Sequence, residues 1–230
     1  VASLYGRNSL LDIVSRTANE ISIPLTVGGG IRTLDDIRAL LRAGADKVAI
    51  NTAAVARPDF IREAAHAFGS STIVIAVEAI RENNGVYLAY TDNGREHTGL
   101  DAFAWAEQAA ALGAGEIIAT SVDREGTGLG YDADLIRGIA SRVSIPVVAH
   151  GGAGKADDVA DAVSAGADAV CLASILHYKT AEKLVKEHII QEDEGNLEFL
   201  LQGKSFGKVG RAELADIRQA LLDRQIPCRH

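Results

Sequence analysis

The chain is poor in the residue types that build disulfide-stapled folds, metal centres and membrane spans. Its 230 residues include no Met, one Trp, four Pro and two Cys, and only 5% are aromatic. Cys171 and Cys228 are too few and too far apart for a disulfide scaffold or a zinc site, and they fit a reducing cytoplasm, where we expect the protein to reside. No apolar run reaches transmembrane length. We therefore expect no membrane association, no metal site and no cofactor.

Positive charge is also scarce. Lys and Arg total 23 against 31 Asp and Glu, which gives a formal net charge of −8 and a pI near 5.2. This balance disfavours nucleic acid as a partner, because phosphate backbones attract basic surfaces. Any phosphate recognition must then be local, through backbone amides and a few cations. With 47% hydrophobic residues, the chain has enough apolar surface for one large folded domain or two small ones.

An internal repeat is the strongest signal in the sequence. The segments 23–30 and 145–152 align without a gap at a spacing of 122 residues, which places Gly28-Gly29-Gly30 opposite His150-Gly151-Gly152. The match continues through the segments 35–46 and 157–168. Each copy reads as an apolar strand, a glycine turn, a helix and a second apolar strand. A duplicated βαβ unit of this kind predicts a barrel.

The rest of the chain alternates in the same way. Strand-like runs occupy residues 24–28, 47–51, 72–78, 116–120, 146–150 and 168–172. Helical patterns occupy about 8–20, 34–43, 57–68, 100–112, 132–141 and 156–165. Alternation predicts an α/β fold with a parallel sheet and outer helices. Asp92-Asn93-Gly94, between the runs 86–90 and 95–97, predicts a β-hairpin.

Six strands are fewer than the eight of a closed barrel. We expect a (β/α)8 barrel that is truncated at its N-terminus, with strands three to eight present and Val1-Ala2 as the stub of strand two. Residues 1–178 would form this partial barrel. Residues 179–230 would add C-terminal helices, one of them over 212–222, and an inserted polar segment at 188–210, packed on the same barrel.

The glycine turns predict phosphate sites. In a (β/α)8 barrel the loops after the strands form the active site, and glycine turns expose backbone N–H groups to anions. Gly29 and Gly30 with Asn51 and Thr52 would form one site. The second site would consist of Gly151, Gly152, Ala173 and Ser174. Two sites on one face predict a small-molecule substrate with a phosphate at each end. The alternative is that the glycines merely close tight turns.

Several acidic residues follow strands. Glu78 ends an apolar strand, and Asp123 and Glu125 lie just after Thr120. A carboxylate at the mouth of an apolar barrel is suited to act as acid or base, and the alternative is a salt-bridged strand end. We expect Thr120 to line the substrate site. Lys47 and Glu116 instead begin strands and so belong to the opposite mouth, where a stabilising ion pair is the usual role.

Four motifs together resemble the cyclase subunit of imidazole glycerol phosphate synthase. They are LTVGGGIR at 25–32, AGADKVAIN at 43–51, GAGEIIATSVDREGT at 113–127 and HGGAGK at 150–155. The resemblance covers about residues 1–178 and implies a (β/α)8 barrel, a lyase that cyclises its substrate in histidine biosynthesis, and a glutaminase partner. Ammonia from that partner would enter the bottom mouth, where Lys47 and Glu116 match two gate residues. It would convert a ribulosyl aminoimidazole carboxamide nucleotide to imidazole glycerol phosphate and the carboxamide nucleotide.

The chain departs from this family pattern at four points. The family has an Asp where this chain has Glu78, a second Asp where it has Glu125, and a small residue where it has His150. A further catalytic Asp lies on the family's first strand, which this chain does not contain, so we expect residues 1–230 alone to lack activity. Glu78 keeps two alternatives open. One is an ammonia-conducting subunit for sugar amidination in surface-polysaccharide biosynthesis, and the other is a phosphate-ligand binding barrel without catalysis.

Overall fold

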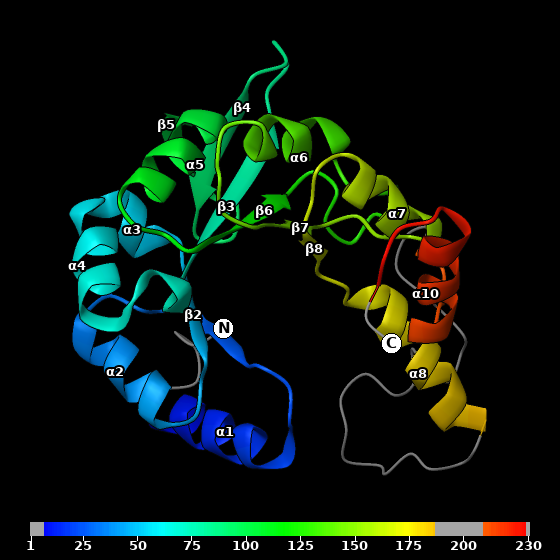
Figure 1. Cartoon of the computed structure of the whole chain (residues 1–230), viewed down its shortest axis with the longest axis horizontal. Helices are drawn as coiled ribbons and strands as arrows, with labels where there is room; N and C mark the ends of the chain where they lie inside the picture. Colours follow the sequence, from blue (N-terminus) through cyan, green and yellow to red (C-terminus); the bar gives the residue numbers. More distant parts are fainter. Residues whose placement is uncertain (1–6, 187–208, 229–230) are drawn as a thin grey trace. The chain divides into compact units, whose positions relative to one another are not determined.

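The computed structural model describes residues 7–186 and 209–228 (Figure 1). The chain separates into two compact units. The first is formed by residues 1–119 and 139–147, and the second by residues 120–138 and 148–230. The first copy of the repeat belongs to the first unit, and the second copy, apart from the start of its first strand, belongs to the second.

The described elements alternate along the chain as expected for an α/β protein. Its strands are β1 (Thr26–Gly28), β2 (Lys47–Ile50), β3 (Ile73–Arg81), β4 (Tyr87–Thr91), β5 (Glu96–Asp101), β6 (Glu116–Ser121), β7 (Val147–His150) and β8 (Ala169–Val170). Its α-helices are α1 (Arg7–Glu20), α2 (Leu34–Arg42), α3 (Thr52–Ala56), α4 (Asp59–Phe68), α5 (Ala102–Ala111), α6 (Ala133–Ala140), α7 (Asp157–Ser164), α8 (Ser174–Lys186) and α10 (Leu214–Asp223).

The sheet of the first unit has the strand order β1-β2-β3-β6. β1 and β2 are parallel with Gly28 opposite Ala49, and β2 and β3 are parallel with Val48 opposite Ile73. Runs of β-branched residues form these strands because both faces of a parallel sheet are covered. Ile73, Val74 and Ile75 are accordingly fully buried. Parallel pairing brings the carboxyl ends of β1 and β2 to the same edge of the sheet.

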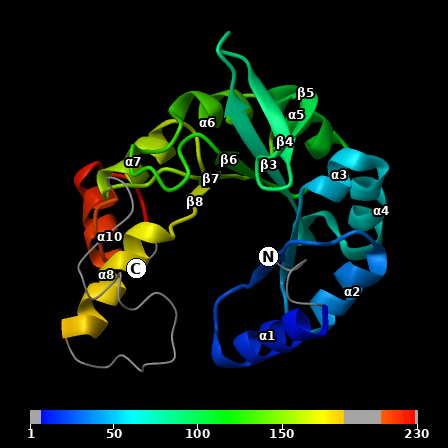
Figure 2. The ribbon, with the colours of Figure 1, turned by 180° about the vertical axis from the view of Figure 1, so that it is seen from behind.

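A hairpin extends this sheet beyond the barrel strands. β4 pairs antiparallel with β3 and with β5, and Figure 2 shows β4 beside β3. Asp92, Asn93 and Gly94 all have positive φ, of 52°, 59° and 74°. Asn, Asp and Gly tolerate this left-handed backbone better than other residues do, which is why the sequence signalled the turn. The predicted hairpin is confirmed.

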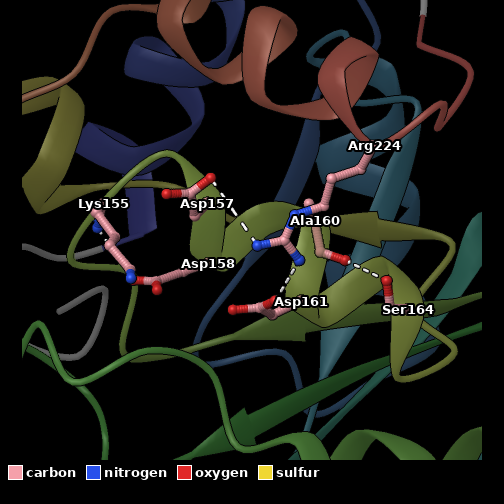
Figure 3. Close-up of polar contacts among 7 residues, drawn as sticks. All are labelled: Lys155, Asp157, Asp158, Ala160, Asp161, Ser164 and Arg224. Carbon is pink, nitrogen blue, oxygen red and sulfur yellow. Dashed lines mark hydrogen bonds and ion pairs between the residues drawn. The ribbon is translucent and has the colours of Figure 1, made fainter.

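The second unit contains the carboxyl ends of β6 and β7 together with β8. β7 and β8 are parallel, with Val148 opposite Ala169. Helices α7, α8 and α10 supply the buried residues Val159, Ile175 and Ile217 to one hydrophobic cluster. Helix α10 packs on α7. Just beyond α10, the Arg224 guanidinium lies between two carboxylates of α7 and forms a hydrogen-bonded ion pair with one of them (Figure 3).

The strand and helix predictions are confirmed except at two places. The expected helix over 57–68 begins at Asp59, and a separate short helix, α3, precedes it. The expected strand over 168–172 is shorter, because β8 contains only Ala169–Val170. The α/β class and the alternation of parallel strands with helices are those of a (β/α)8 barrel. The proposed strand stub at Val1-Ala2 and most of the segment 188–210 lie outside the described residues, and the boundary at residue 178 stays a prediction.

Candidate active site

The first glycine turn follows β1 in the first unit. Gly29 and Gly30 are exposed and have φ of 103° and 71°. Because β1 and β2 end at one edge, this turn adjoins Asn51, which follows β2. The Asn51 side-chain nitrogen donates to the Tyr90 carbonyl at 3.1 Å, and Thr52 begins α3 with an exposed side chain. These residues therefore lie along one edge of the sheet, and their binding of phosphate stays a prediction.

The second glycine turn lines a cavity of about 420 Å³ in the second unit. This cavity brings together all four residues predicted for the second phosphate site: Gly151, Gly152, Ala173 and Ser174. Two residues that depart from the family pattern also line it, Glu125 and His150. The other lining residues are Val122, Gly126, Ala153, Cys171 and Val209.

Packing also requires glycine in this second turn. A Cβ at Gly152, where φ is 112°, would lie 2.2 Å from the Gly130 carbonyl oxygen, and one at Gly151 would lie 2.6 Å from the Ser121 carbonyl oxygen. The Gly130 N–H donates to the Gly152 carbonyl at 2.8 Å. Beside phosphate binding and simple turn closure, the structure adds a third reason for glycine, which is the close approach of two loops.

Both copies of the repeat have the same hydrogen bonds between the glycine turn and the helix that follows it. The Asp158 carboxylate accepts from the N–H groups of Gly154 at 2.8 Å and Lys155 at 3.0 Å, and Figure 3 shows it beside Lys155. In the first copy Asp36 accepts from the two corresponding N–H groups, at 2.9 and 3.0 Å. These amides already donate to a carboxylate, so the predicted phosphate contacts fall on the glycines that precede them.

The imidazole of His150, which lines the cavity, lies between Thr120 and Glu125. Thr120 is buried, and its Oγ1 lies 3.1 Å from His150 Nδ1. The other ring nitrogen, His150 Nε2, lies 4.0 Å from Glu125 Oε1. The structure thus joins Thr120 and Glu125, both predicted site residues, through a histidine that the sequence analysis noted only as a departure. Asp123 is exposed and is not among the described residues that line the cavity.

Glu78 lies on β3 in the first unit and is half-buried. Its Oε2 accepts a 2.8 Å hydrogen bond from the N–H of Gly94, in the hairpin turn. The turn therefore fixes one carboxylate oxygen of Glu78. The sequence analysis did not foresee this contact, although the Asn-Gly signal of the hairpin placed the turn correctly.

Lys47 and Glu116 form the predicted pair at the amino ends of their strands. Lys47 Nζ lies 2.6 Å from Glu116 Oε2, with 33% and 17% of the side chains exposed. The ion pair is present although β3 lies between their strands, β2 and β6. Two long side chains reach across the start of β3. A gate function for the pair stays a prediction.

Some groups near the second turn gave no signal in the sequence. The Tyr131 hydroxyl donates to the Cys171 carbonyl at 2.8 Å, and burial raises the pKa of this phenol. The Ser121 hydroxyl is buried without a hydrogen-bond partner. Within residues 7–186 and 209–228, no three His, Cys, Asp or Glu side chains gather as metal ligands. In the same part of the chain, no helix combines the length and apolarity that crossing a membrane requires.

Comparison with known proteins gives one family match that contains all the predicted site residues and every cavity-lining residue except Val209. The histidine biosynthesis protein family matches residues 1–182. Imidazole glycerol phosphate synthase subunit HisF of Streptomyces griseus subsp. griseus is 52% identical over 177 residues, which cover 77% of this chain and 70% of that protein. The subunits of the same name from Pyrobaculum aerophilum and Legionella pneumophila are 52% and 55% identical, over 178 and 158 residues. These alignments cover 77% and 69% of this chain and 70% and 74% of the relatives.

Proposed function

The chain belongs to the histidine biosynthesis protein family, and we propose that it is the cyclase subunit of imidazole glycerol phosphate synthase. The observation that carries this proposal is the 52% identity to subunits of that name over 177 residues. The cavity in the second unit supports it, because it gathers the predicted phosphate residues with a carboxylate and an imidazole. The reaction class is that of an ammonia-using lyase.

Each part of the site has a task in this reaction. The two glycine turns bind the phosphate groups at the two ends of the substrate through backbone N–H groups. Glu78 transfers protons as ammonia attacks the ribulosyl aminoimidazole carboxamide nucleotide, and the products are imidazole glycerol phosphate and the carboxamide nucleotide. Lys47 and Glu116 form the gate through which ammonia from a glutaminase subunit enters. The glutaminase is thus the proposed protein partner.

Ammonia-dependent turnover tests the proposal directly. The full-length protein is incubated with the ribulosyl aminoimidazole carboxamide nucleotide and an ammonium salt, and imidazole glycerol phosphate is measured. A second reaction replaces ammonium with glutamine and the glutaminase subunit. We expect product in both. Binding of the nucleotide without turnover in either reaction would favour a phosphate-ligand binding barrel without catalysis.

One observation favours a second candidate function. The hairpin turn fixes the carboxylate of Glu78. The family pattern has Asp at this position, and the longer Glu displaces the carboxylate by one C–C bond. A carboxylate displaced in this way is poorly placed for the same chemistry. A barrel that only conducts ammonia to a sugar-amidating enzyme of surface-polysaccharide biosynthesis needs no acid or base at this place. The genes beside the coding sequence offer a quick test, since histidine genes favour the cyclase and sugar-modifying genes favour the conduit.

We expect two phosphate sites of unequal accessibility. Titration of inorganic phosphate into ¹⁵N-labelled protein should shift the backbone amide signals of Gly29 and Gly30 and those of Gly151 and Gly152 in separate phases. The exposed first turn should respond independently of the cavity-lined second turn. The amides of Lys155 and Gly154 should shift less because Asp158 holds them. Phosphate that shifts neither glycine pair would refute the bis-phosphate substrate.

We expect Lys47→Ala to uncouple glutamine consumption from product formation. Removing the side-chain ammonium group of Lys47 leaves Glu116 without this ion pair, at the end of the sheet where ammonia is proposed to enter. Activity with free ammonium should stay within about twofold, while product formed per glutamine consumed falls. Arg62→Ala, which removes an exposed ion pair with Asp59, is the control and should change neither quantity. Equal loss with both nitrogen sources would show that the pair serves stability and not passage.

A further inference from the structure

The two ring nitrogens of His150 face two side chains of the second unit. Nδ1 lies 3.1 Å from the Thr120 hydroxyl and Nε2 lies 4.0 Å from the Glu125 carboxylate. Thr120 is 5% exposed, so the ring is anchored on the buried side. Glu125 has about half of its side chain exposed and lines the cavity. The ring therefore lies between a buried hydroxyl and an exposed acid.

The glycine turn itself does not require this imidazole. Across the 122-residue repeat, His150 corresponds to Gly28, and the first copy forms its turn with no side chain at that position. Gly28 and His150 both end a strand and precede two glycines with positive φ. In the second copy, Thr120 and Glu125 lie beside the residue that precedes the two glycines. We therefore relate the histidine to the nearby acid, Glu125, and not to the formation of the turn.

We propose that His150 is a positioning residue that holds the Glu125 carboxylate over the second phosphate turn. We assign the Thr120 hydroxyl as the donor to Nδ1, which puts the ring proton on the Nε2 that faces Glu125. The long side chain of Glu125 otherwise samples many rotamers, and a polar ring edge 4.0 Å from its carboxylate favours those that face the imidazole. The two departures of this chain from the family pattern, Glu125 and His150, are then one functional unit: the longer acid and the imidazole compensate each other.

The kinetic test of this inference rests on the proposed cyclase activity. In full-length protein supplied with ammonium, His150→Ser should lower kcat about tenfold and leave KM within about twofold, because the acid loses its orientation while the glycine turn still binds phosphate. Glu125→Asp should have a similar effect, since the shorter acid no longer reaches the imidazole. The double variant, which restores the family's shorter acid and small residue, should recover to within about threefold of the parent.

The controls separate positioning from plain stability. His66→Ala removes an exposed histidine on α4 and should leave kcat and KM unchanged. If the fold-loss of kcat in the double variant equals the product of the fold-losses in the two single variants, the residues act independently and the proposal fails. An increase in KM as large as the fall in kcat would assign His150 to phosphate binding and would also overturn it.

A spectroscopic measurement tests the pair without any catalysis. Long-range ¹H–¹⁵N spectra of histidine-labelled protein report which ring nitrogen carries the proton. We expect the Nε2–H form for His150, with Thr120→Val changing the Nδ1 signal and Glu125→Gln changing the Nε2 signal. If both variants leave the His150 signals unmoved, the positioning proposal is wrong. Intact coupling in a protein without cyclase activity would instead count against the proposed function alone.

Discussion

Glu78→Gln is expected to lower ammonia-dependent kcat/KM by about 10²–10⁴-fold, the usual contribution of a positioned acid–base group. Gln has the shape of Glu and retains a carbonyl oxygen that accepts the 2.8 Å hydrogen bond from Gly94. The hairpin turn should therefore stay in place while the group that transfers protons is lost. The measurement is steady-state turnover of the full-length protein with ammonium as the nitrogen source.

A matched substitution separates this effect from a change in fold. Glu96 is exposed on β5 of the same hairpin, and Glu96→Gln should leave kcat/KM near the parent value. Circular dichroism should show the same secondary structure in both variants. If Glu78→Gln is harmless while ammonia still reaches a second enzyme, Glu78 has no catalytic role, and the conduit for sugar amidination becomes the better account of the chain.

The sequence predicted those features that depend on local pattern. Runs of β-branched residues such as Ile73, Val74 and Ile75 identify strands that are buried on both faces, and the structure has β3 there. The Asn93-Gly94 pair predicts its turn because both residues accept positive φ. The repeat also located the second glycine turn together with Ser174, and the structure gathers these residues at one cavity.

Features that depend on close approach in three dimensions gave no such pattern. From its sequence context Gly152 is a turn glycine, whereas its missing Cβ leaves room for the carbonyl of Gly130, 22 residues earlier in the chain. His150 is likewise visible in the sequence only as a departure from the family pattern, and its neighbours Thr120 and Glu125 are not. Such contacts join residues far apart in sequence, so no periodicity or short motif encodes them.

Gly152→Ala is expected to destabilise the second unit by about 3 kcal/mol, since it adds overpacking to the strain of a left-handed backbone. The new Cβ would meet the Gly130 carbonyl at 2.2 Å at a backbone φ of 112°. The loops must move apart, and the 2.8 Å hydrogen bond from Gly130 N–H to the Gly152 carbonyl is lost. Hydrogen exchange should therefore quicken by about 10²-fold in peptides that cover residues 126–138 and 148–156.

Gly126→Ala is the control, because it introduces the same methyl group in the same unit without the collision. Gly126 also has positive φ, 71°, but a Cβ there meets no atom within 4 Å. Only backbone strain remains, and exchange should quicken by about tenfold, which corresponds to the 1–2 kcal/mol cost of a left-handed L-residue. Equal effects of the two substitutions would show that strain alone explains both glycines. A larger effect at Gly152 means that glycine is needed for the packing of two loops, and phosphate binding then uses a turn that packing has already fixed.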